Sequence, residues 1–197
     1  TELASAAPAP GGGGGAAMAG ALAAALASMV ANLTIGKEKF ADREPEVKEL
    51  LEQAEAERVR LLTLVDEDAA VFNSFMSCYK LPKTTDEEKA ARAAAIRAAA
   101  KRAATVPLNI ARSSFAVLKL ADRLVVSGNP GVITDGACSG LLARAALRCA
   151  EYNVRINLGL TKDEAWNAQA AADLKQLLAD AEALETRLLA VTDKALQ

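Results

Sequence analysis

The sequence contains no histidine, so it lacks the side chain that most often moves protons or binds transition metals near neutral pH. Proton transfer must therefore rely on Asp, Glu, Lys, Tyr, Cys or water. The three cysteines, Cys78, Cys138 and Cys149, are odd in number and lack C-x-x-C spacing. We therefore expect reduced thiols, a cytoplasmic protein and no bound metal.

Aromatic residues are scarce at 4% of the chain, and much of the 52% hydrophobic content is alanine. Small side chains of this kind allow helices to approach closely. The net charge is only −2, and acidic and basic residues are intermixed along the 197 residues. This pattern provides no basic patch that could bind nucleic acid or anionic lipid, so we expect neither partner.

Charged residues are also missing from residues 3 to 36, a stretch that includes five consecutive glycines. We expect residues 1–15 to form a Pro/Gly-rich loop leading into a helix from Ala16 to Val30. The glycines suit either a flexible tether or a loop whose amides receive a ligand. A membrane span is not expected, because the stretch consists of Ala and Gly rather than Leu, Ile and Phe and lacks a basic leader.

The remaining sequence has helical periodicity and no sustained alternation of polar and apolar residues. Helices are expected over residues 16–30, 45–81, 86–126, 134–158 and 162–197. Thr85, Thr134 and Thr161 are the expected N-caps, with capping-box glutamates after the first and last, and Pro107 should kink its helix. We predict an all-α antiparallel bundle of about five long helices, forming one domain over residues 1–197 and a homodimer.

Several polar residues occupy positions that suggest a role beyond contact with solvent. Asp68 falls on the buried face of its helix, where a carboxylate needs a partner such as a salt bridge, or has a functional role. Asp135 opens its helix among glycines, where it either stabilises the first turn or faces a cleft. Asn153 and Asn157 share one helix face and can bridge helices or bind a heterocycle.

Taken in order, a series of short stretches resembles the cyclodeaminase/cyclohydrolase family of tetrahydrofolate one-carbon enzymes. The resemblance covers nearly the whole chain. The stretches are Ala7-Pro8-Ala9-Pro10-Gly11-Gly12-Gly13, Asn32-Leu33-Thr34-Ile35-Gly36-Lys37, Val65-Asp66-Glu67-Asp68 with Phe72, Lys80-Leu81-Pro82-Lys83, Val106-Pro107-Leu108, Gly128-Asn129, Thr134-Asp135 and Asn153-Val154-Arg155-Ile156-Asn157-Leu158. Ala9 and Gly14 stand where the family loop usually has threonine and serine, so any hydroxyl contact there is absent.

The resemblance implies an all-helical homodimer that binds a reduced folate and needs no other cofactor and no metal. Asp135 or Asp68 would act as base and proton shuttle, with Lys37 as an electrostatic or acid partner. Substrate contacts are expected from Gly11, Gly12, Gly13, Asn32, Thr34, Lys80, Lys83, Asn129, Asn153 and Asn157. Among these, the asparagines at 153 and 157 would bind the pterin and the lysines at 80 and 83 would attract the glutamate tail.

Methenyltetrahydrofolate cyclohydrolase activity is the function that we expect. Formiminotetrahydrofolate cyclodeaminase activity stays open, because both reactions pass through one tetrahedral carbon and need the same proton transfers. A third possibility, of another class, is a non-catalytic helical dimer acting as a scaffold or regulator.

Overall fold

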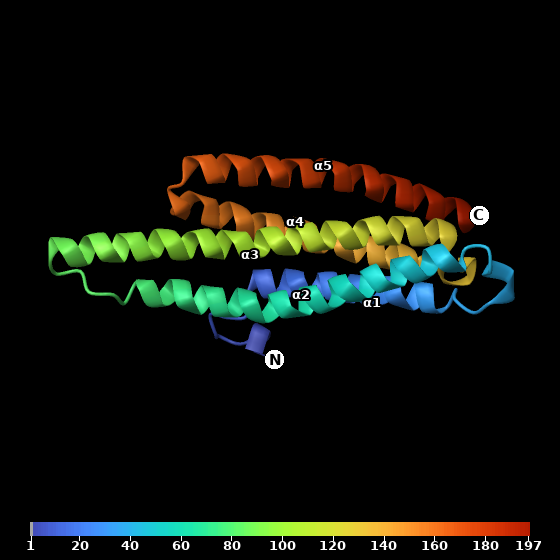
Figure 1. Ribbon diagram of the computed structural model, residues 1–197, viewed down its shortest axis with the longest axis horizontal. Coiled ribbons are helices and arrows are strands. Elements are labelled where there is room, and N and C mark those ends of the chain that lie inside the picture. The colour runs from blue at the N-terminus through green and yellow to red at the C-terminus, as the bar shows by residue number, and fades with distance from the viewer. Residues whose placement is uncertain (1) are drawn as a thin grey trace.

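The computed structural model describes residues 2–197, and within them the fold is entirely helical (Figure 1). This confirms the all-α prediction. The helices are α1 (Gly12–Asn32), α2 (Glu44–Cys78), α3 (Asp86–Ser127), α4 (Ile133–Thr161) and α5 (Glu164–Ala195). Short 3₁₀ turns lie at Glu2–Ala4, Glu38–Phe40 and Pro130–Val132.

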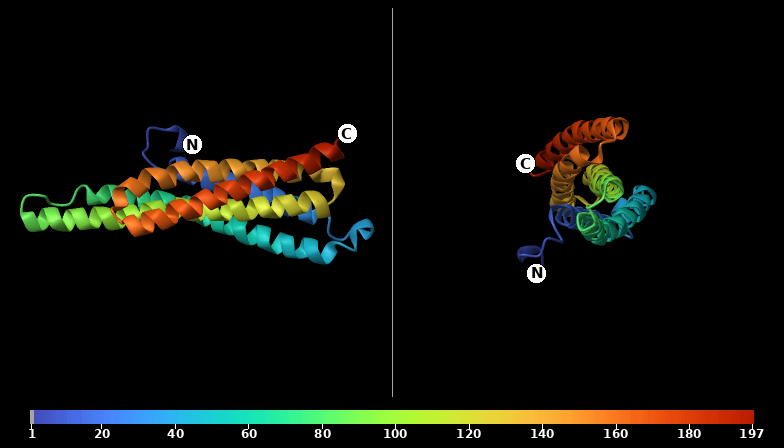
Figure 2. Two further views of the ribbon diagram at one scale, coloured as in Figure 1. Left: turned by 90° about the horizontal axis from the view of Figure 1, so that it is seen from above. Right: turned by 90° about the vertical axis from the view of Figure 1, so that its left-hand side faces the viewer.

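The helices form an elongated bundle in which consecutive helices run in opposite directions (Figures 1 and 2). The longest helix, α3, packs against all four others, whereas α5 packs mainly on α3 and α4. The first helix, α1, lies against α2, α3 and α4. Because α2 and α3 extend past the end of α4, their connecting turn projects from one end of the bundle (Figure 1).

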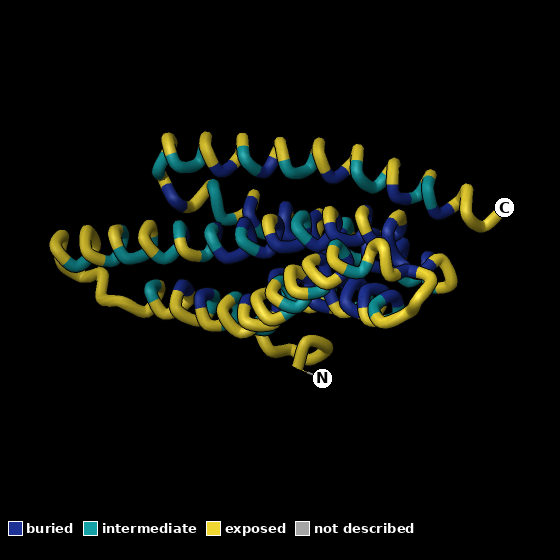
Figure 3. The backbone as a smooth tube through the Cα atoms, turned by 45° about the vertical axis from the view of Figure 1, so that its right-hand side comes forward, coloured by how far each residue is buried: buried dark blue, intermediate teal, exposed yellow. Residues whose placement is uncertain are grey.

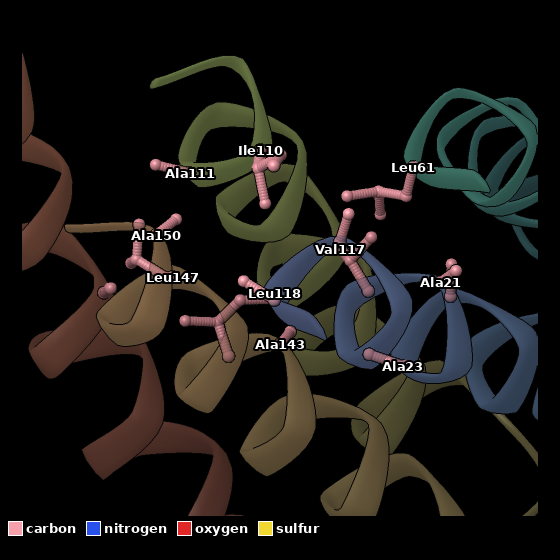
Figure 4. Packing of buried hydrophobic residues seen from close by; sticks show 14 of the residues in the cluster. Ala21, Ala23, Leu61, Ile110, Ala111, Val117, Leu118, Ala143, Leu147 and Ala150 are labelled. Carbon is pink, nitrogen blue, oxygen red and sulfur yellow. The ribbon is translucent and has the colours of Figure 1, made fainter. Parts of the chain in front are cut away.

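Small side chains line the contacts of α1 with its neighbours. Ala21 and Ala23 of α1 and Ala143 of α4 are buried in the same cluster as Leu61 and Leu118 (Figure 4). Burial is concentrated in this centre, while α5 keeps one side exposed along its length (Figure 3). Because aromatic residues are scarce, the core is formed by helices that pack closely through small side chains.

The first helix begins earlier than predicted. Residues 12–15 were expected to belong to a loop, but they form the first turn of α1, with Gly11 as its N-cap. Glycine is costly inside a helix but tolerable in the first turn, where the amides lack helical partners anyway. This helix is the only one in residues 2–197 long and apolar enough to cross a membrane, and 61% of that apolar stretch is buried within the bundle.

Two of the predicted helix caps are wrong and one is confirmed. Thr85 forms the predicted capping box at the start of α3. The N-cap of α4 is Val132 rather than Thr134, because a 3₁₀ turn leads directly into the helix. At α5 the cap is Asp163, whose side chain accepts a hydrogen bond from the amide of Trp166, because α4 extends as far as Thr161.

Candidate functional site

A cavity of about 340 Å³ lies where the start of α1 meets the second half of α2, α3 and the last turns of α4. Gly11, Gly12 and Gly13 form one side of it, and the preceding Pro8 and Ala9 lie at its edge. The cavity therefore brings together segments that are more than 140 residues apart in the sequence. A site of this size can hold a small organic ligand.

Among residues 2–197, Asp68 is the only charged residue that lines this cavity. One of its carboxylate oxygens accepts a hydrogen bond from the amide of Gly14 at 2.9 Å. Burial raises the pKa of the Asp68 carboxyl above its usual value, and the Gly14 hydrogen bond opposes this only partly. The result is a partly buried carboxyl group able to exchange a proton closer to neutral pH than an exposed aspartate can.

The absence of a side chain at Gly13 is required by Asp68. A Cβ at this position would lie 2.2 Å from the nearer carboxylate oxygen, a distance at which the two atoms overlap. Gly13 therefore makes room for the carboxylate at the start of α1. Gly13 is a predicted substrate contact, and it lies against both the cavity and the Asp68 carboxylate.

The two predicted asparagines of α4 both line the cavity. Asn153 donates from Nδ2 to the carbonyl of Cys149 at 2.9 Å. Asn157 donates from Nδ2 to the carbonyl of Asn153 at 2.8 Å and to that of Ala103 at 3.0 Å. With their amide hydrogens engaged in this way, both side chains can present a carbonyl oxygen to donors on a ligand.

Pro107 explains why the Ala103 carbonyl is free to bind Asn157. In a helix this carbonyl would accept from the amide of residue 107, but proline has no amide hydrogen. The helix α3 continues through Pro107, and Asn157 supplies the missing donor. From the sequence we predict only a kink at this proline. Its position four residues after Ala103 also indicates that the Ala103 carbonyl lacks a helical donor, which is the signal for this link.

The rest of the cavity wall is apolar. Val71, Phe72 and Phe75 come from α2, and Ile156 and Leu160 come from α4. Spacings of three and four residues place the α2 side chains on the same face as Asp68. The cavity therefore combines one acid and two amides with flat apolar surfaces, an arrangement that suits an aromatic heterocycle with polar edges. Of these side chains, Phe72 and Ile156 belong to the stretches that carry the family resemblance.

Comparison with known proteins agrees with this geometry. The sequence profile described as formiminotransferase-cyclodeaminase matches residues 1–176. The chain belongs to this family. A methenyltetrahydrofolate cyclohydrolase from Methylorubrum extorquens is 46% identical over 94% of this chain and 89% of its own length. The family resemblance inferred from the sequence is therefore confirmed.

Other relatives in the family are longer or catalyse a different step. Formimidoyltransferase-cyclodeaminase from Sus scrofa is 34% identical over 91% of this chain, which corresponds to 33% of the pig protein. The crystal structure of formiminotetrahydrofolate cyclodeaminase from Thermotoga maritima aligns with a TM-score of 0.88 at 29% identity. That alignment covers 99% of this chain and 93% of the Thermotoga chain.

The remaining predicted family residues do not gather at the cavity of the same chain. Asp135 lies in the first turn of α4 and Asn153 eighteen residues later, about 27 Å along the helix. Lys37 is exposed in the connection between α1 and α2, at the same end of the bundle as Asp135. Within the single chain, only Asp68 of the three predicted catalytic residues faces the cavity.

Two residues at that second end that are predicted substrate contacts form hydrogen bonds within the chain. The Thr34 hydroxyl donates to the carbonyl of Val30 at 2.7 Å and accepts from the amide of Asn129 at 2.8 Å. The Asn129 side chain donates to the carbonyl of Leu33 at 3.1 Å. These bonds tie the end of α1 to the turn before α4. Asn32, the last residue of α1, is exposed.

The predicted tail-binding lysines lie beyond the end of α2. Lys80 and Lys83 are exposed in the turn between α2 and α3 and do not line the cavity. A row of aromatic side chains leads from the cavity toward them, because Phe75 packs edge-on against Tyr79 with ring centroids 5.3 Å apart.

Proposed function

We propose that this protein is a methenyltetrahydrofolate cyclohydrolase, which hydrolyses 5,10-methenyltetrahydrofolate to 10-formyltetrahydrofolate. The observation that carries the proposal is the carboxyl group of Asp68, partly buried in a cavity that also offers two amides and phenyl rings. The 46% identity to a cyclohydrolase over nearly the full length of both chains supports it.

Asp68 is the proposed proton carrier. Water adds to the amidinium carbon of the substrate, and the Asp68 carboxylate takes a proton from the attacking oxygen. The neutral carbinolamine then collapses: the bond from this carbon to N5 breaks, N5 receives the proton from Asp68, and the hydroxyl proton leaves to solvent as the formyl C=O forms. One proton is released overall, as the loss of the substrate's positive charge requires. General acid–base help of this kind contributes about 10² to 10⁴ in rate.

The other cavity groups position the substrate. The carbonyl oxygens of Asn153 and Asn157 accept hydrogen bonds from the donors on the pterin edge. Phe72 and Phe75 pack against the p-aminobenzoyl ring. Lys80 and Lys83 attract the glutamate carboxylates at the outer end of the substrate. Catalysis on this scheme uses side chains and water, and we propose no metal or further cofactor.

Cyclodeaminase activity is the second candidate, supported by the name of the Thermotoga structure that aligns over 99% of this chain. In that reaction N10 of 5-formiminotetrahydrofolate attacks the formimino carbon, and ammonia leaves. The same carboxyl would take a proton from N10 and deliver one to the departing nitrogen. Because both reactions form one tetrahedral carbon, a single cavity serves either.

An absorbance assay separates the two activities and tests both against a non-catalytic role. The purified protein is given methenyltetrahydrofolate and formiminotetrahydrofolate in separate reactions. We expect loss of the methenyl chromophore in the first reaction at a rate well above that of buffer. Appearance of that chromophore from the formimino compound, without hydrolysis of the methenyl compound, would favour the deaminase, and no change with either would support a scaffold.

We further propose that the protein is a cytoplasmic homodimer that binds neither nucleic acid nor membranes. The exposed side of α1 bears apolar Met18, Leu22 and Met29, with 44%, 54% and 44% of their surface accessible. A net charge of −2 with intermixed signs gives no basic patch for nucleic acid or anionic lipid. A second copy of the chain is the partner that we assign to this apolar surface.

A further inference from the structure

The first turn of α1 is capped by a side chain from another helix. Gly11, the N-cap of α1, has no side chain that could bind the free amides of this turn. An N-cap side chain usually binds the amide two or three residues later. Here Asp68 of α2 takes this place, because its Oδ2 accepts a hydrogen bond from the Gly14 amide at 2.9 Å. The proposed proton carrier is therefore also the cap of α1.

The two carboxylate oxygens of Asp68 face two successive glycines. Oδ1 lies against Gly13, where a Cβ would overlap it, and Oδ2 binds the amide of Gly14. Among residues 2–197, this amide is the only hydrogen-bond donor to the carboxylate. A carboxylate can accept several hydrogen bonds. Asp68 therefore has fewer donors than its two oxygens can use.

Within the described chain, no charged group faces Asp68 from the elements packed around it. Helix α1 has no charged residue, and the cavity residues of α3, α4 and the segment before α1 are uncharged. The charged residues next to the wall positions are Asp66, Glu67, Arg102 and Arg155, which are exposed and do not line the cavity. Hydrogen bonding is therefore the local effect that can oppose the burial of this carboxyl group.

Gly14 has room for a side chain, whereas Gly13 has none. A Cβ at residue 14 would lie 3.5 Å from Cβ of Pro10, 3.7 Å from the carbonyl oxygen of Val65 and 3.9 Å from Oδ2 of Asp68. These are ordinary contact distances. The backbone φ of Gly14 is not positive, so other residues can adopt its conformation. Neither space nor backbone geometry requires glycine at this position.

A hydroxyl group at residue 14 would reach the carboxylate. A serine Oγ lies one bond beyond Cβ, so it can come within hydrogen-bonding distance of Oδ2, an oxygen–oxygen separation of about 2.5–3.0 Å. Such a bond stabilises the ionised carboxylate and makes it a weaker base. The family loop usually has serine here, and this chain has glycine. The glycine therefore removes a donor that the position could otherwise supply.

We propose that residue 14 sets the basicity of Asp68, and that glycine there keeps the carboxylate basic enough to take a proton from water near neutral pH. Gly14 is a positioning residue in this scheme. Its amide holds Oδ2, and its lack of a side chain leaves this oxygen without a second donor. The inference rests on the proposed cyclohydrolase activity, in which Asp68 must be ionised to accept the proton. Residue 14 then determines the pH below which hydrolysis slows.

The pH dependence of hydrolysis in Gly14→Ser and Gly14→Ala tests the proposal. Initial rates of methenyltetrahydrofolate hydrolysis are divided by the wild-type rate at each pH, which removes the pH dependence of the substrate itself. We expect the serine variant to have a lower plateau rate, because its base is weaker. At acid pH it should keep a several-fold larger share of that plateau than the wild type does. The alanine variant adds a methyl group without a donor, so its acid midpoint should match the wild type.

Gly15→Ser is the matched control for this experiment. A Cβ at residue 15 meets nothing within 4 Å, so the added hydroxyl has no contact with Asp68 and the pH profile should be that of the wild type. Equal acid midpoints in Gly14→Ser and Gly14→Ala would overturn the proposal. This includes the case in which the serine hydroxyl donates to the Val65 carbonyl instead of the carboxylate.

Thermal unfolding tests the same link without relying on activity. A lower pKa of Asp68 in the folded state adds stability above the unfolded pKa and none below both values. The melting temperature of Gly14→Ser should therefore rise relative to that of Gly14→Ala between pH 3 and pH 7. This gain should vanish when both variants also carry Asp68→Asn. A difference that does not change with pH, or that persists without Asp68, would contradict the proposal. The expected gain in a protein without hydrolase activity would leave the link between residue 14 and Asp68 intact and refute the proposed function.

Discussion

At the scale of single residues, the proton transfer proposed for Asp68 depends on two opposing effects on the pKa of its carboxyl group. Partial burial favours the neutral carboxyl and raises its pKa, whereas the hydrogen bond from the Gly14 amide favours the carboxylate. Burial is the larger influence. The chain has no histidine, so a proton carrier must be another residue. The surroundings of Asp68 bring the pKa of this aspartate toward neutrality, which suits it to that role.

The same pKa shift makes Asp68 a cost to stability at neutral pH. A carboxyl whose pKa is higher in the folded state destabilises the fold once it ionises, and this cost disappears below the unfolded pKa. Asp68→Asn should therefore raise the melting temperature near pH 7 and leave it unchanged near pH 3. Thermal unfolding monitored by circular dichroism across this range measures the difference. A variant less stable than the wild type at pH 7 would contradict the assignment of burial as the larger influence.

Gly13 gives a second prediction at the residue scale. In Gly13→Ala the new methyl group overlaps the Asp68 carboxylate, so the acid must move and hydrolysis should fall more than tenfold. Gly159→Ala is the matched control, because a Cβ there meets nothing within 4 Å and the residue is also helical. The control should keep its activity and gain about 0.5–1 kcal/mol in stability. Equal rates for both variants would argue against a constrained carboxylate.

At the scale of helices, Pro107 couples α3 to α4. It removes the backbone donor for the carbonyl of Ala103, and Asn157 takes the vacant place. The helix is weakened locally, while a polar side chain at the cavity becomes fixed. Helix periodicity predicted the five helices well, because apolar spacing follows from the geometry of the helix itself. The link from Pro107 to Asn157 depends on how α3 and α4 pack, which no local pattern specifies.

Pro107→Ala tests this coupling. Alanine restores the amide donor, which competes with Asn157 for the Ala103 carbonyl. We expect an unchanged or higher melting temperature together with a KM for methenyltetrahydrofolate several times higher, and a similar KM for Asn157→Ala. Steady-state kinetics on the two variants provide the comparison. A wild-type KM in Pro107→Ala would show that the hydrogen bond does not position the substrate.

The start of α1 shows where local sequence reasoning fails. Five glycines favour a loop by propensity, yet four of them enter the helix. Tertiary contacts outweigh propensity here: the amide of Gly14 binds Asp68, and Gly13 leaves space for it. At α4 and α5 the predicted threonine caps were displaced for a related reason, because neighbouring turns and Asp163 provide alternative starts. Helix boundaries depend on such details more than helix positions do.

At the scale of the whole molecule, one chain holds only part of the predicted site. Asp68, Asn153, Asn157 and the glycines at 11 to 13 all line the cavity, and their catalytic and binding roles stay predictions. The predicted helix over residues 134–158 already separates Asp135 from Asn153 by eighteen residues, or about 27 Å along the helix axis.

Leu22→Glu tests the dependence of activity on the dimer. A glutamate at the middle of the apolar α1 face places like charges near each other in the paired copies and should give a monomer. We expect light scattering to report half of the wild-type mass and hydrolysis to fall at least tenfold, with helix content retained. Leu62→Glu is the control, since Leu62 is exposed on α2 outside this face and should tolerate the change. A fully active monomer would show that one chain suffices.

The most direct test of the central claim compares the hydrolysis of methenyltetrahydrofolate by the wild type, Asp68→Asn and Asp66→Asn. Asp66 is exposed two residues before Asp68 and does not line the cavity, so its variant controls for loss of charge on the same helix. We predict that Asp68→Asn lowers kcat more than tenfold with little change in KM, while Asp66→Asn matches the wild type. A wild-type kcat in Asp68→Asn would contradict the account.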